Sequence, residues 1–310
     1  TPQTEIAHYL AKKMPEVGGT FIQAESEVAA INMVYGAASA GARVLTSSSS
    51  PGISLKQEGL SYLAGAELPA VVVNIVRCGP GLGGILPAQG DYFQAVKGGG
   101  HGDYKMVVLA PSSVQELYEL TVEAFNIADR YRIVSMIMGD GILGQMMEAV
   151  EFKDVENIEK IDKPWATTGT QMKREHNTIT SIYIQPEVLE KHNQKLQAKY
   201  RLIEERETRV ESYNCENADI IVTAFGTVAR IVKNVIKMAE KEGIKVGLIR
   251  PITLWPFPTK EYEKYADVPK AFLTVELNAG QMVEDVRLAV NGKKPVYFHG
   301  RMGGMIPTQK

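Results

Sequence analysis

The stretch Ala70–Val76, which reads AVVVNIV, decides the fold. Its nearly unbroken run of β-branched and other aliphatic residues is typical of a strand that is buried on both faces of a parallel sheet. Two similar runs occur at 106–110 and 133–138, and an amphipathic helix is predicted between them over 114–130. Strands that alternate with helices of this length predict a doubly wound α/β domain.

The same alternation extends toward the N-terminus. A helix of small residues is predicted over 25–42, followed by a strand over 44–46 and a second helix over 55–66. The small side chains of the helix over 25–42 indicate that it packs very close to a neighbour. We expect this first domain to occupy residues 1–150.

The rest of the chain divides into two parts. Residues 151–216 contain few apolar runs, and we interpret the charge-dense stretch 187–211 as a solvated connecting helix. Beyond it the alternation resumes, which predicts a second, smaller α/β domain over 217–310. Its expected strands are 220–224, 245–250, 271–276 and 295–299, and its expected helices are 227–242 and 281–290.

Composition and charge exclude several classes of protein. Hydrophobic residues make up 45% of the 310 residues and charged residues 23%, as in soluble globular proteins. The 34 basic and 36 acidic residues give a net charge of -2, so no positive excess is available to neutralise a nucleic acid backbone. The longest apolar stretches, such as 69–76, are far shorter than the roughly 20 residues that span a membrane. Neither nucleic acid nor a membrane is an expected partner.

The chain has two cysteines, Cys78 and Cys215, which do not form a Cys-x-x-Cys pair. An iron–sulfur cluster needs about four thiolates, so this chain cannot hold one alone. The five histidines lack the spacing of metal ligands, and no metal site is predicted in this chain. The low cysteine count and the lack of a secretion signal in this sequence indicate a reducing, cytoplasmic location.

A glycine loop follows the strand at 70–76. Gly79, Gly81 and Gly84 formally satisfy G-x-G-x-x-G, which would make a nicotinamide-dependent oxidoreductase one alternative. That motif requires a helix to open at the third glycine, whereas Pro87 and Gly90 interrupt any such helix. We therefore favour an active-site loop whose backbone approaches a ligand or a partner chain closely.

The sequence Gly139-Asp140-Gly141 resembles the start of the Mg-diphosphate motif of thiamine enzymes. That motif also needs a pair of asparagines downstream, and none occurs at the required place. We favour a turn at the end of a strand.

Two charged residues stand out by position. Glu27 begins the helix of small residues, where a carboxylate either complements the helix N-terminus or needs a functional hydrogen-bonding partner. Arg77 ends a buried strand at its carboxyl edge, where doubly wound sheets bind ligands. Its guanidinium can hold a carboxylate through two hydrogen bonds or form a structural ion pair.

Several motifs together resemble one family over nearly the whole chain. They are Thr1-Pro2, AESEVAAINM at 24–33, NIVRCGP at 74–80, GHGDY at 100–104, LAP at 109–111, AFGTVAR at 224–230 and GRMGG at 300–304. With them the sequence resembles the alpha subunit of the 2-oxoacid:ferredoxin oxidoreductases, nearest to the branched-chain, 2-oxoisovalerate type.

This resemblance implies oxidative decarboxylation of a 2-oxoacid on thiamine diphosphate, giving an acyl-CoA, CO2 and reduced ferredoxin. The first domain would be a pyrimidine-binding domain of a thiamine enzyme, and the second would resemble the C-terminal domain of transketolase. A beta subunit would supply the Mg-diphosphate site and a [4Fe–4S] cluster, and gamma and delta subunits are further expected partners. The same reaction on 2-oxoglutarate or pyruvate, or a non-catalytic scaffold of a complex, are the alternatives.

The resemblance also implies three site residues. Glu27 matches the glutamate that hydrogen-bonds the aminopyrimidine of thiamine diphosphate and so helps to activate it. Arg77 matches the arginine that holds the substrate carboxylate. Thr1 matches the threonine of a Pro-Ile-Thr-Pro turn that helps to position the substrate.

Overall fold

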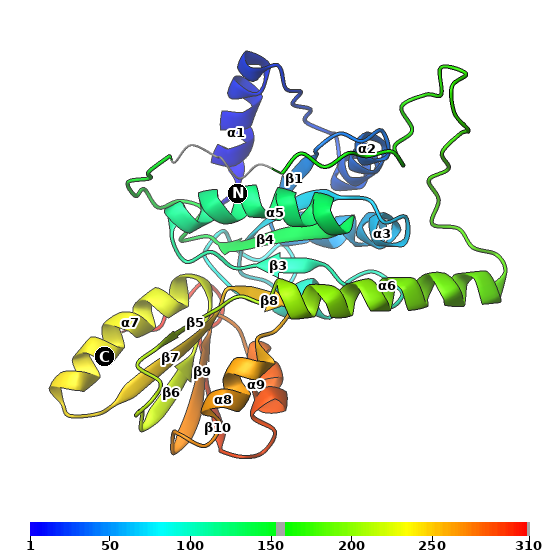
Figure 1. The fold of residues 1–310 in the computed structure, drawn as a ribbon. Coiled ribbons are helices and arrows are strands. Elements are labelled where there is room, and N and C mark those ends of the chain that lie inside the picture. The colour runs from blue at the N-terminus through cyan, green and yellow to red at the C-terminus, as the bar shows by residue number, and fades with distance from the viewer. Residues whose placement is uncertain (153–158, 309–310) are drawn as a thin grey trace.

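A computed structural model describes residues 1–152 and 159–308 of the chain. Residues 153–158, in the predicted connecting segment, and residues 309–310, in the predicted C-terminal domain, lie outside the described residues. The described residues form two five-stranded sheets with helices packed against them (Figure 1).

The first sheet has the strand order β1-β2-β4-β3-β8. Four of its strands are parallel, and β8 pairs with β3 in the antiparallel direction. All seven residues of β2 are buried, as are all seven of β4, which confirms a parallel sheet covered on both faces. The strands are β1 (Leu45–Ser48), β2 (Ala70–Val76), β3 (Val107–Leu109), β4 (Val134–Asp140) and β8 (Thr253–Trp255).

Helices cover this sheet. They are α1 (Thr4–Lys13), the short 3-10 turn η1 (Pro15–Val17), α2 (Glu27–Ser39), α3 (Pro51–Gly65), α4 (Tyr92–Val96) and α5 (Val114–Tyr131). The helices α2 and α3 pack on each other so closely that a Cβ atom added at Gly59 would lie 2.5 Å from a side-chain carbon of Ile31. The prediction that the helix of small residues packs very close to a neighbour is confirmed.

The second sheet has the strand order β10-β9-β6-β7-β5, in which β5 alone is antiparallel. Helix α7 covers one face, and α8 and α9 lie on the other (Figure 1). The strands are β5 (Val210–Tyr213), β6 (Ile220–Thr223), β7 (Val246–Pro251), β9 (Ala271–Glu276) and β10 (Val296–Gly300); the helices are α7 (Gly226–Lys241), α8 (Thr259–Tyr265) and α9 (Met282–Val290). The predicted strands and helices of this region are confirmed, with boundary shifts of at most one residue.

Helix α6 (Pro186–Arg206) runs along the edge of the first sheet (Figure 1). It buries Leu196, Tyr200 and Ile203, and Lys195 and Lys199 form ion pairs with Glu67. Although burial raises the pKa of Glu67, these two lysines hold it at about 2. The helix is therefore attached to the first sheet along one face rather than solvated all round.

The prediction that this helix continues to residue 211 is wrong, because it ends at Arg206 and residues 210–213 form β5. The chain is extended there because β5 pairs with β7 at the edge of the second sheet. The division of the chain into domains at residues 150 and 216 stays a prediction.

Polar contacts join the two sheets. Thr227, at the start of α7, donates a hydrogen bond to Asp140 at the end of β4. Gln89 donates to the carbonyl of Phe225 at 3.0 Å and accepts from the backbone of Leu277 at 3.0 Å. The carboxyl end of the first sheet is thus fixed against the second sheet.

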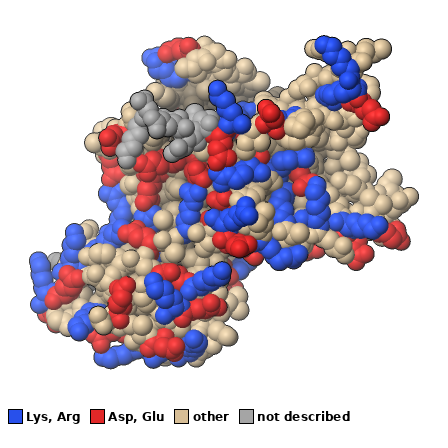
Figure 2. Space-filling view, in the orientation of Figure 1, with Lys and Arg blue, Asp and Glu red and all other residues tan. Residues whose placement is uncertain are grey.

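On the face shown in Figure 2, acidic and basic side chains are interspersed rather than gathered by sign. Within the described residues, no helix combines the length and the apolar character that crossing a membrane requires.

Candidate active site

The N-terminal segment lies across the carboxyl ends of the first sheet's strands. The hydroxyl of Ser47, in β1, donates to the side-chain oxygen of Gln3 at 3.0 Å. A Cβ atom added at Gly144, just beyond β4, would lie 2.6 Å from the carbonyl oxygen of Pro2. Thr1 is exposed beside this segment, and its hydroxyl lies 3.1 Å from that of Thr4. Thr1 therefore lies at the carboxyl edge of the sheet, where doubly wound sheets bind ligands.

Glu27 is the first residue of α2 and is half-buried. The helix begins there because the hydroxyl of Ser26 accepts a hydrogen bond from the backbone N–H of Ala29 at 3.2 Å. The hydroxyl of Ser48, at the end of β1, donates to Oε1 of Glu27 at 3.3 Å. Among the described residues, Ser48 is the one hydrogen-bond partner of this carboxyl group, so it retains acceptor capacity for a ligand.

Gly52, near the start of α3, lets the Glu27 carboxyl group and the Ser48 hydroxyl lie close against the helix backbone. A Cβ atom at residue 52 would lie 2.0 Å from the hydroxyl oxygen of Ser48 and 2.5 Å from Oε1 of Glu27. Such distances are sterically forbidden, so a side chain at this position would displace the pair. The absence of a side chain at Gly52 is a requirement of the Glu27 site.

Arg77 follows β2 directly. Its backbone N–H donates to the hydroxyl of Ser50 at 3.1 Å, and that hydroxyl lies 3.3 Å from the carbonyl oxygen of Arg77. Within the described part of the chain, the buried Nε atom of Arg77 has no hydrogen-bond partner. A guanidinium with a free donor at this edge suits a carboxylate ligand better than a purely structural ion pair.

Polar side chains hold Ser50 in an unusual backbone conformation, with φ 37° and ψ -81°. Asn74, fully buried in β2, accepts from the backbone N–H of Ser50 at 3.1 Å and donates to Asp91 at 2.9 Å. Burial raises the pKa of Asp91, while hydrogen bonds from Asn74 and Ser50 oppose the rise. Backbone strain of this kind persists only where surrounding contacts enforce it.

The structure thus brings two of the three predicted site residues to one short turn. Ser48 contacts Glu27, and Ser50, two residues later, contacts the backbone of Arg77. Sequence reasoning missed Ser48, Ser50 and Gly52. The one signal that could have pointed to this turn is Asn74, a polar residue inside the otherwise apolar AVVVNIV strand.

The glycine loop lacks the helix that a dinucleotide site requires. The chain turns back after Gly84, whose N–H donates to the carbonyl of Cys78 at 2.9 Å, and Pro87 forms a bridge with Arg77. The next helix, α4, begins only at Tyr92. The loop therefore does not have the geometry of a nicotinamide-binding turn.

Asp140 accepts hydrogen bonds from groups of the protein itself. Its carboxyl group is buried, accepts from the backbone N–H groups of Ile142 and Leu143 at 2.9 and 3.1 Å, and also binds Thr227. Burial raises the pKa of this carboxyl group. This is the strand-end turn that the incomplete Gly-Asp-Gly motif predicts.

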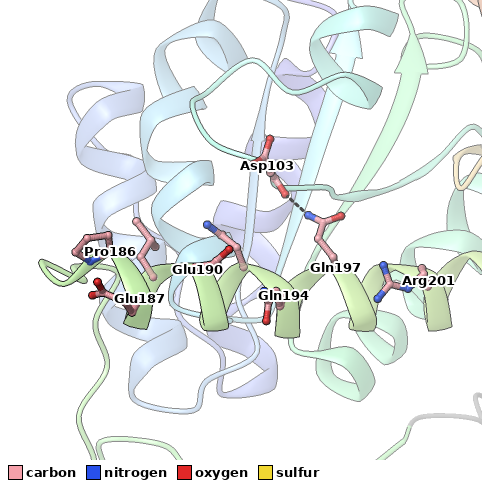
Figure 3. A pocket seen from close by; sticks show the side chains of 9 residues that line it. Asp103, Pro186, Glu187, Glu190, Gln194, Gln197 and Arg201 are labelled. Atoms are coloured by element: carbon pink, nitrogen blue, oxygen red, sulfur yellow. Dashed lines mark hydrogen bonds between the residues drawn. The ribbon is translucent and has the colours of Figure 1, made fainter.

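An open groove of about 770 Å³ lies elsewhere, between α6 and the glycine-rich loop that contains Asp103 (Figure 3). Gln197 of α6 donates to the backbone carbonyl of Asp103 at 2.8 Å along this groove. None of the three predicted site residues lines it. We therefore place the candidate active site at the Ser48–Ser50 turn.

Comparisons with known proteins identify relatives of this chain over nearly its whole length. Residues 1–212 match the family model described as pyruvate flavodoxin/ferredoxin oxidoreductase, thiamine diphosphate-binding, and residues 218–310 match pyruvate:ferredoxin oxidoreductase core domain II. The ketoisovalerate oxidoreductase subunit VorB of Methanothermobacter thermautotrophicus is 52% identical over 304 residues, covering 98% of this chain and 86% of VorB.

Two solved structures share the fold. A 2-oxoglutarate:ferredoxin oxidoreductase from Magnetococcus marinus, with 2-oxoglutarate, coenzyme A and succinyl-CoA bound, matches with a TM-score of 0.84 and 27% identity. The match covers 100% of this chain and 59% of that one. A split-gene transketolase matches with a TM-score of 0.56 and 14% identity, covering 94% of this chain and 77% of the other.

The fold is therefore that of the class to which transketolase and the 2-oxoacid oxidoreductases belong. Within that class, the chain belongs to the pyruvate flavodoxin/ferredoxin oxidoreductase family, the 2-oxoacid:ferredoxin oxidoreductases. The resemblance that the sequence motifs indicated is confirmed.

Proposed function

We propose that this chain is the alpha subunit of a thiamine-diphosphate-dependent 2-oxoacid:ferredoxin oxidoreductase. The reaction is the oxidative decarboxylation of a branched-chain 2-oxoacid, 2-oxoisovalerate, to an acyl-CoA and CO2 with reduction of ferredoxin. The observation that carries this proposal is the Glu27 carboxyl group, which has one hydrogen-bond partner among the described residues and lies close against Gly52. We also propose that residues 1–150 form the pyrimidine-binding domain, 151–216 the connecting segment and 217–310 the C-terminal domain.

The residues present fit the aminopyrimidine end of thiamine diphosphate. Glu27 offers a carboxyl oxygen, and the hydroxyl of Ser49 is buried without a hydrogen-bond partner among the described residues. Unsatisfied buried polar atoms of this kind are costly unless a ligand completes them. Among the described residues, Asp140 is not free to serve the diphosphate end, because Thr227 and two backbone N–H groups already occupy its carboxyl group.

When bound, thiamine diphosphate supplies the carbon nucleophile that attacks a 2-oxo group. Glu27 would hold a proton on its carboxyl oxygen and share it with a ring nitrogen of the aminopyrimidine. This contact tunes the acid–base chemistry of the site and orients the ring.

Arg77 and Thr1 would bind the substrate. The buried Nε donor of Arg77 suits the carboxylate of a 2-oxoacid, because a guanidinium binds carboxylates through short, charge-assisted hydrogen bonds. Thr1 would add a hydroxyl contact from the segment that crosses the same sheet edge.

A partner beta subunit would complete the site and supply Mg²⁺ and the diphosphate contacts. The turn of the glycine loop exposes an apolar surface next to Arg77, and Gly304 packs against this loop at Leu86. We call this the apolar loop surface; it consists of Leu82, Ile85, Leu86, Met302 and Met305. Exposed apolar side chains on one loop and on the segment that approaches it favour a protein interaction site, and this loop begins next to Arg77.

The [4Fe–4S] clusters would be held by partner subunits, because Cys78 and Cys215 are both buried and are far fewer than the thiolates a cluster needs. Cys78 follows β2 of the first sheet, and Cys215 lies between β5 and β6 of the second sheet. Gamma and delta subunits, ferredoxin and CoA are the further proposed partners, and the cytoplasm is the proposed location. The VorB relative supports a branched-chain substrate, and the Magnetococcus structure makes 2-oxoglutarate the second candidate.

Reconstitution tests this function. The purified chain alone should contain no stoichiometric iron and should not reduce a viologen dye with any 2-oxoacid. Expressed together with its partner subunits, it should reduce the dye with 2-oxoisovalerate and CoA more efficiently than with 2-oxoglutarate or pyruvate. Dye reduction by the isolated chain, or a complex inactive on all three substrates, would contradict the proposal.

A further inference from the structure

Lys56 lies in the core next to the candidate site, with 1% of its surface exposed. Its ammonium group donates to the hydroxyl of Thr46 at 2.7 Å and to the carbonyl oxygen of Ser47 at 3.2 Å, both in β1. Full burial of a lysine is rare because removing the charge from water is costly. In the described part of the chain no carboxylate lies within ion-pair distance of it.

The position of Lys56 ties it to Glu27. Lys56 is four residues after Gly52 in α3, so both lie on one face of that helix. Gly52 borders the carboxyl group of Glu27, and Ser47, which Lys56 binds, is followed by Ser48, which binds Glu27. One helix face and one strand end thus connect the ammonium group to the carboxyl group.

Glu27 is the charged group that acts on Lys56. Burial lowers its pKa to about 8, and the negative charge of Glu27, from α2, opposes that change. The contacts from β1 are a hydroxyl and a carbonyl, which carry no net charge. Lys56 is therefore easier to deprotonate than an exposed lysine.

We propose that Lys56 is a positioning residue for Glu27, which fixes the end of β1 beneath it and supplies the positive charge that favours sharing of the Glu27 proton with the cofactor. This inference rests on the proposed function of Glu27. Loss of the Lys56 charge weakens that proton sharing, so thiamine diphosphate binds less tightly once Lys56 is neutral. The effect makes cofactor binding depend on pH through a residue that does not touch the cofactor.

Calorimetric titration of the reconstituted complex with thiamine diphosphate and Mg²⁺, from pH 6.5 to 9.5, tests the proposal. Affinity of the wild-type complex should fall about 3- to 10-fold as the pH passes about 8, as expected for the loss of one nearby charge. Lys56→Met should bind more weakly at pH 7 and show no such step. Lys56→Arg keeps the charge and should bind as the wild type does at pH 7, without the step.

Lys199→Met is the matched control, because burial also lowers the pKa of Lys199 but its partner is Glu67, which follows the end of α3 opposite to Gly52. This control should keep the fall in affinity near pH 8.

A Lys56→Met complex that binds with wild-type affinity and shows the same fall would overturn the proposal. If Lys56→Met fails to assemble, a Lys56→Arg complex that still shows the fall near pH 8 would overturn it.

A Glu27→Gln complex distinguishes a failure of the role of Lys56 from a failure of the proposed function of Glu27. If Glu27→Gln abolishes activity while Lys56→Met is silent, only the role of Lys56 fails. If Glu27→Gln behaves as the wild type, the proposed function of Glu27 fails as well.

Discussion

Ser50 and Arg77 are joined twice: the backbone N–H of Arg77 donates to the hydroxyl of Ser50 at 3.1 Å, and the same hydroxyl lies 3.3 Å from the Arg77 carbonyl oxygen. Asn74 fixes Ser50 from the strand behind it. The backbone from which the Arg77 side chain projects is therefore held at both of its polar groups. A side chain on so constrained a backbone can present its donors in a fixed geometry, which lowers the entropic cost of binding.

Arg77→Ala should weaken binding of the 2-oxoacid in the reconstituted complex. Loss of a desolvated, charge-assisted pair costs about 2–5 kcal/mol, so KM should rise about 30-fold or more. Arg77→Lys should restore part of this loss, because lysine keeps the charge but lacks the planar fork. Steady-state kinetics with 2-oxoisovalerate measure the effect, and an unchanged kcat/KM in Arg77→Ala would leave Arg77 with a structural role.

Gly52→Ala should damage the Glu27 site although alanine is the better helix former. The added Cβ atom would lie 2.5 Å from Oε1 of Glu27, so the complex should lose most of its affinity for thiamine diphosphate. Gly36→Ala in α2 is the matched control, since no atom lies within 4 Å of a Cβ there. It should leave affinity unchanged and stabilise the chain by about 0.5–1 kcal/mol in thermal unfolding. Equal affinities in the two variants would argue against a close approach of Gly52 to Glu27.

Leu82→Asp should impair assembly with the partner subunits. Leu82 is 83% exposed in the apolar loop surface, so a charge there should not affect folding but should oppose burial in an interface. Leu288→Asp, at a 73% exposed leucine of α9, is the control. Co-purification of tagged chain with its partners should fall at least tenfold for Leu82→Asp and stay unchanged for Leu288→Asp. Wild-type recovery of partners with Leu82→Asp would place the interface elsewhere.

The stability of the chain should depend on pH through Lys56. Because burial lowers the pKa of Lys56 from 10.5 to about 8, the unfolded chain holds a proton that the folded chain lacks between these two values. Folding stability attributable to Lys56 therefore rises with pH through this window, by about 3 kcal/mol in total. The unfolding free energy of the wild type relative to Lys56→Met, measured with urea, should therefore increase by that amount from pH 8 to pH 10.5. A difference that stays constant with pH would show that Lys56 is not buried as a titrating group.

The sequence predicts the strands of both sheets well where most of their residues are apolar, as at Ala70–Val76 and Ala271–Glu276, whose observed bounds equal the predicted ones. It does not predict β8. This short edge strand follows β7 of the second sheet in the chain but pairs with β3 of the first sheet. Its three residues carry no periodic pattern, and the pairing is set by tertiary contacts.

In the candidate site, too, the sequence predicts the residues that a local pattern or a motif marks, and it misses those that depend on tertiary contacts. Glu27 and Arg77 could be named from family motifs and from their positions at a helix start and a strand end. Gly52 and Lys56 could not, because their roles depend on contacts between α3, α2 and β1 that no local pattern encodes.

The proposed role of Glu27 in activating thiamine diphosphate is tested by the exchange rate of the cofactor's C2 proton in the reconstituted complex. Glutamine at position 27 keeps the shape of the side chain but cannot share a proton as a carboxyl group does. In Glu27→Gln, thiamine diphosphate should still bind, and the rate of C2–H exchange followed by NMR should fall about 10²- to 10⁴-fold together with kcat. Exchange at the wild-type rate in Glu27→Gln would contradict the account and leave Glu27 as a charge that merely stabilises the start of α2.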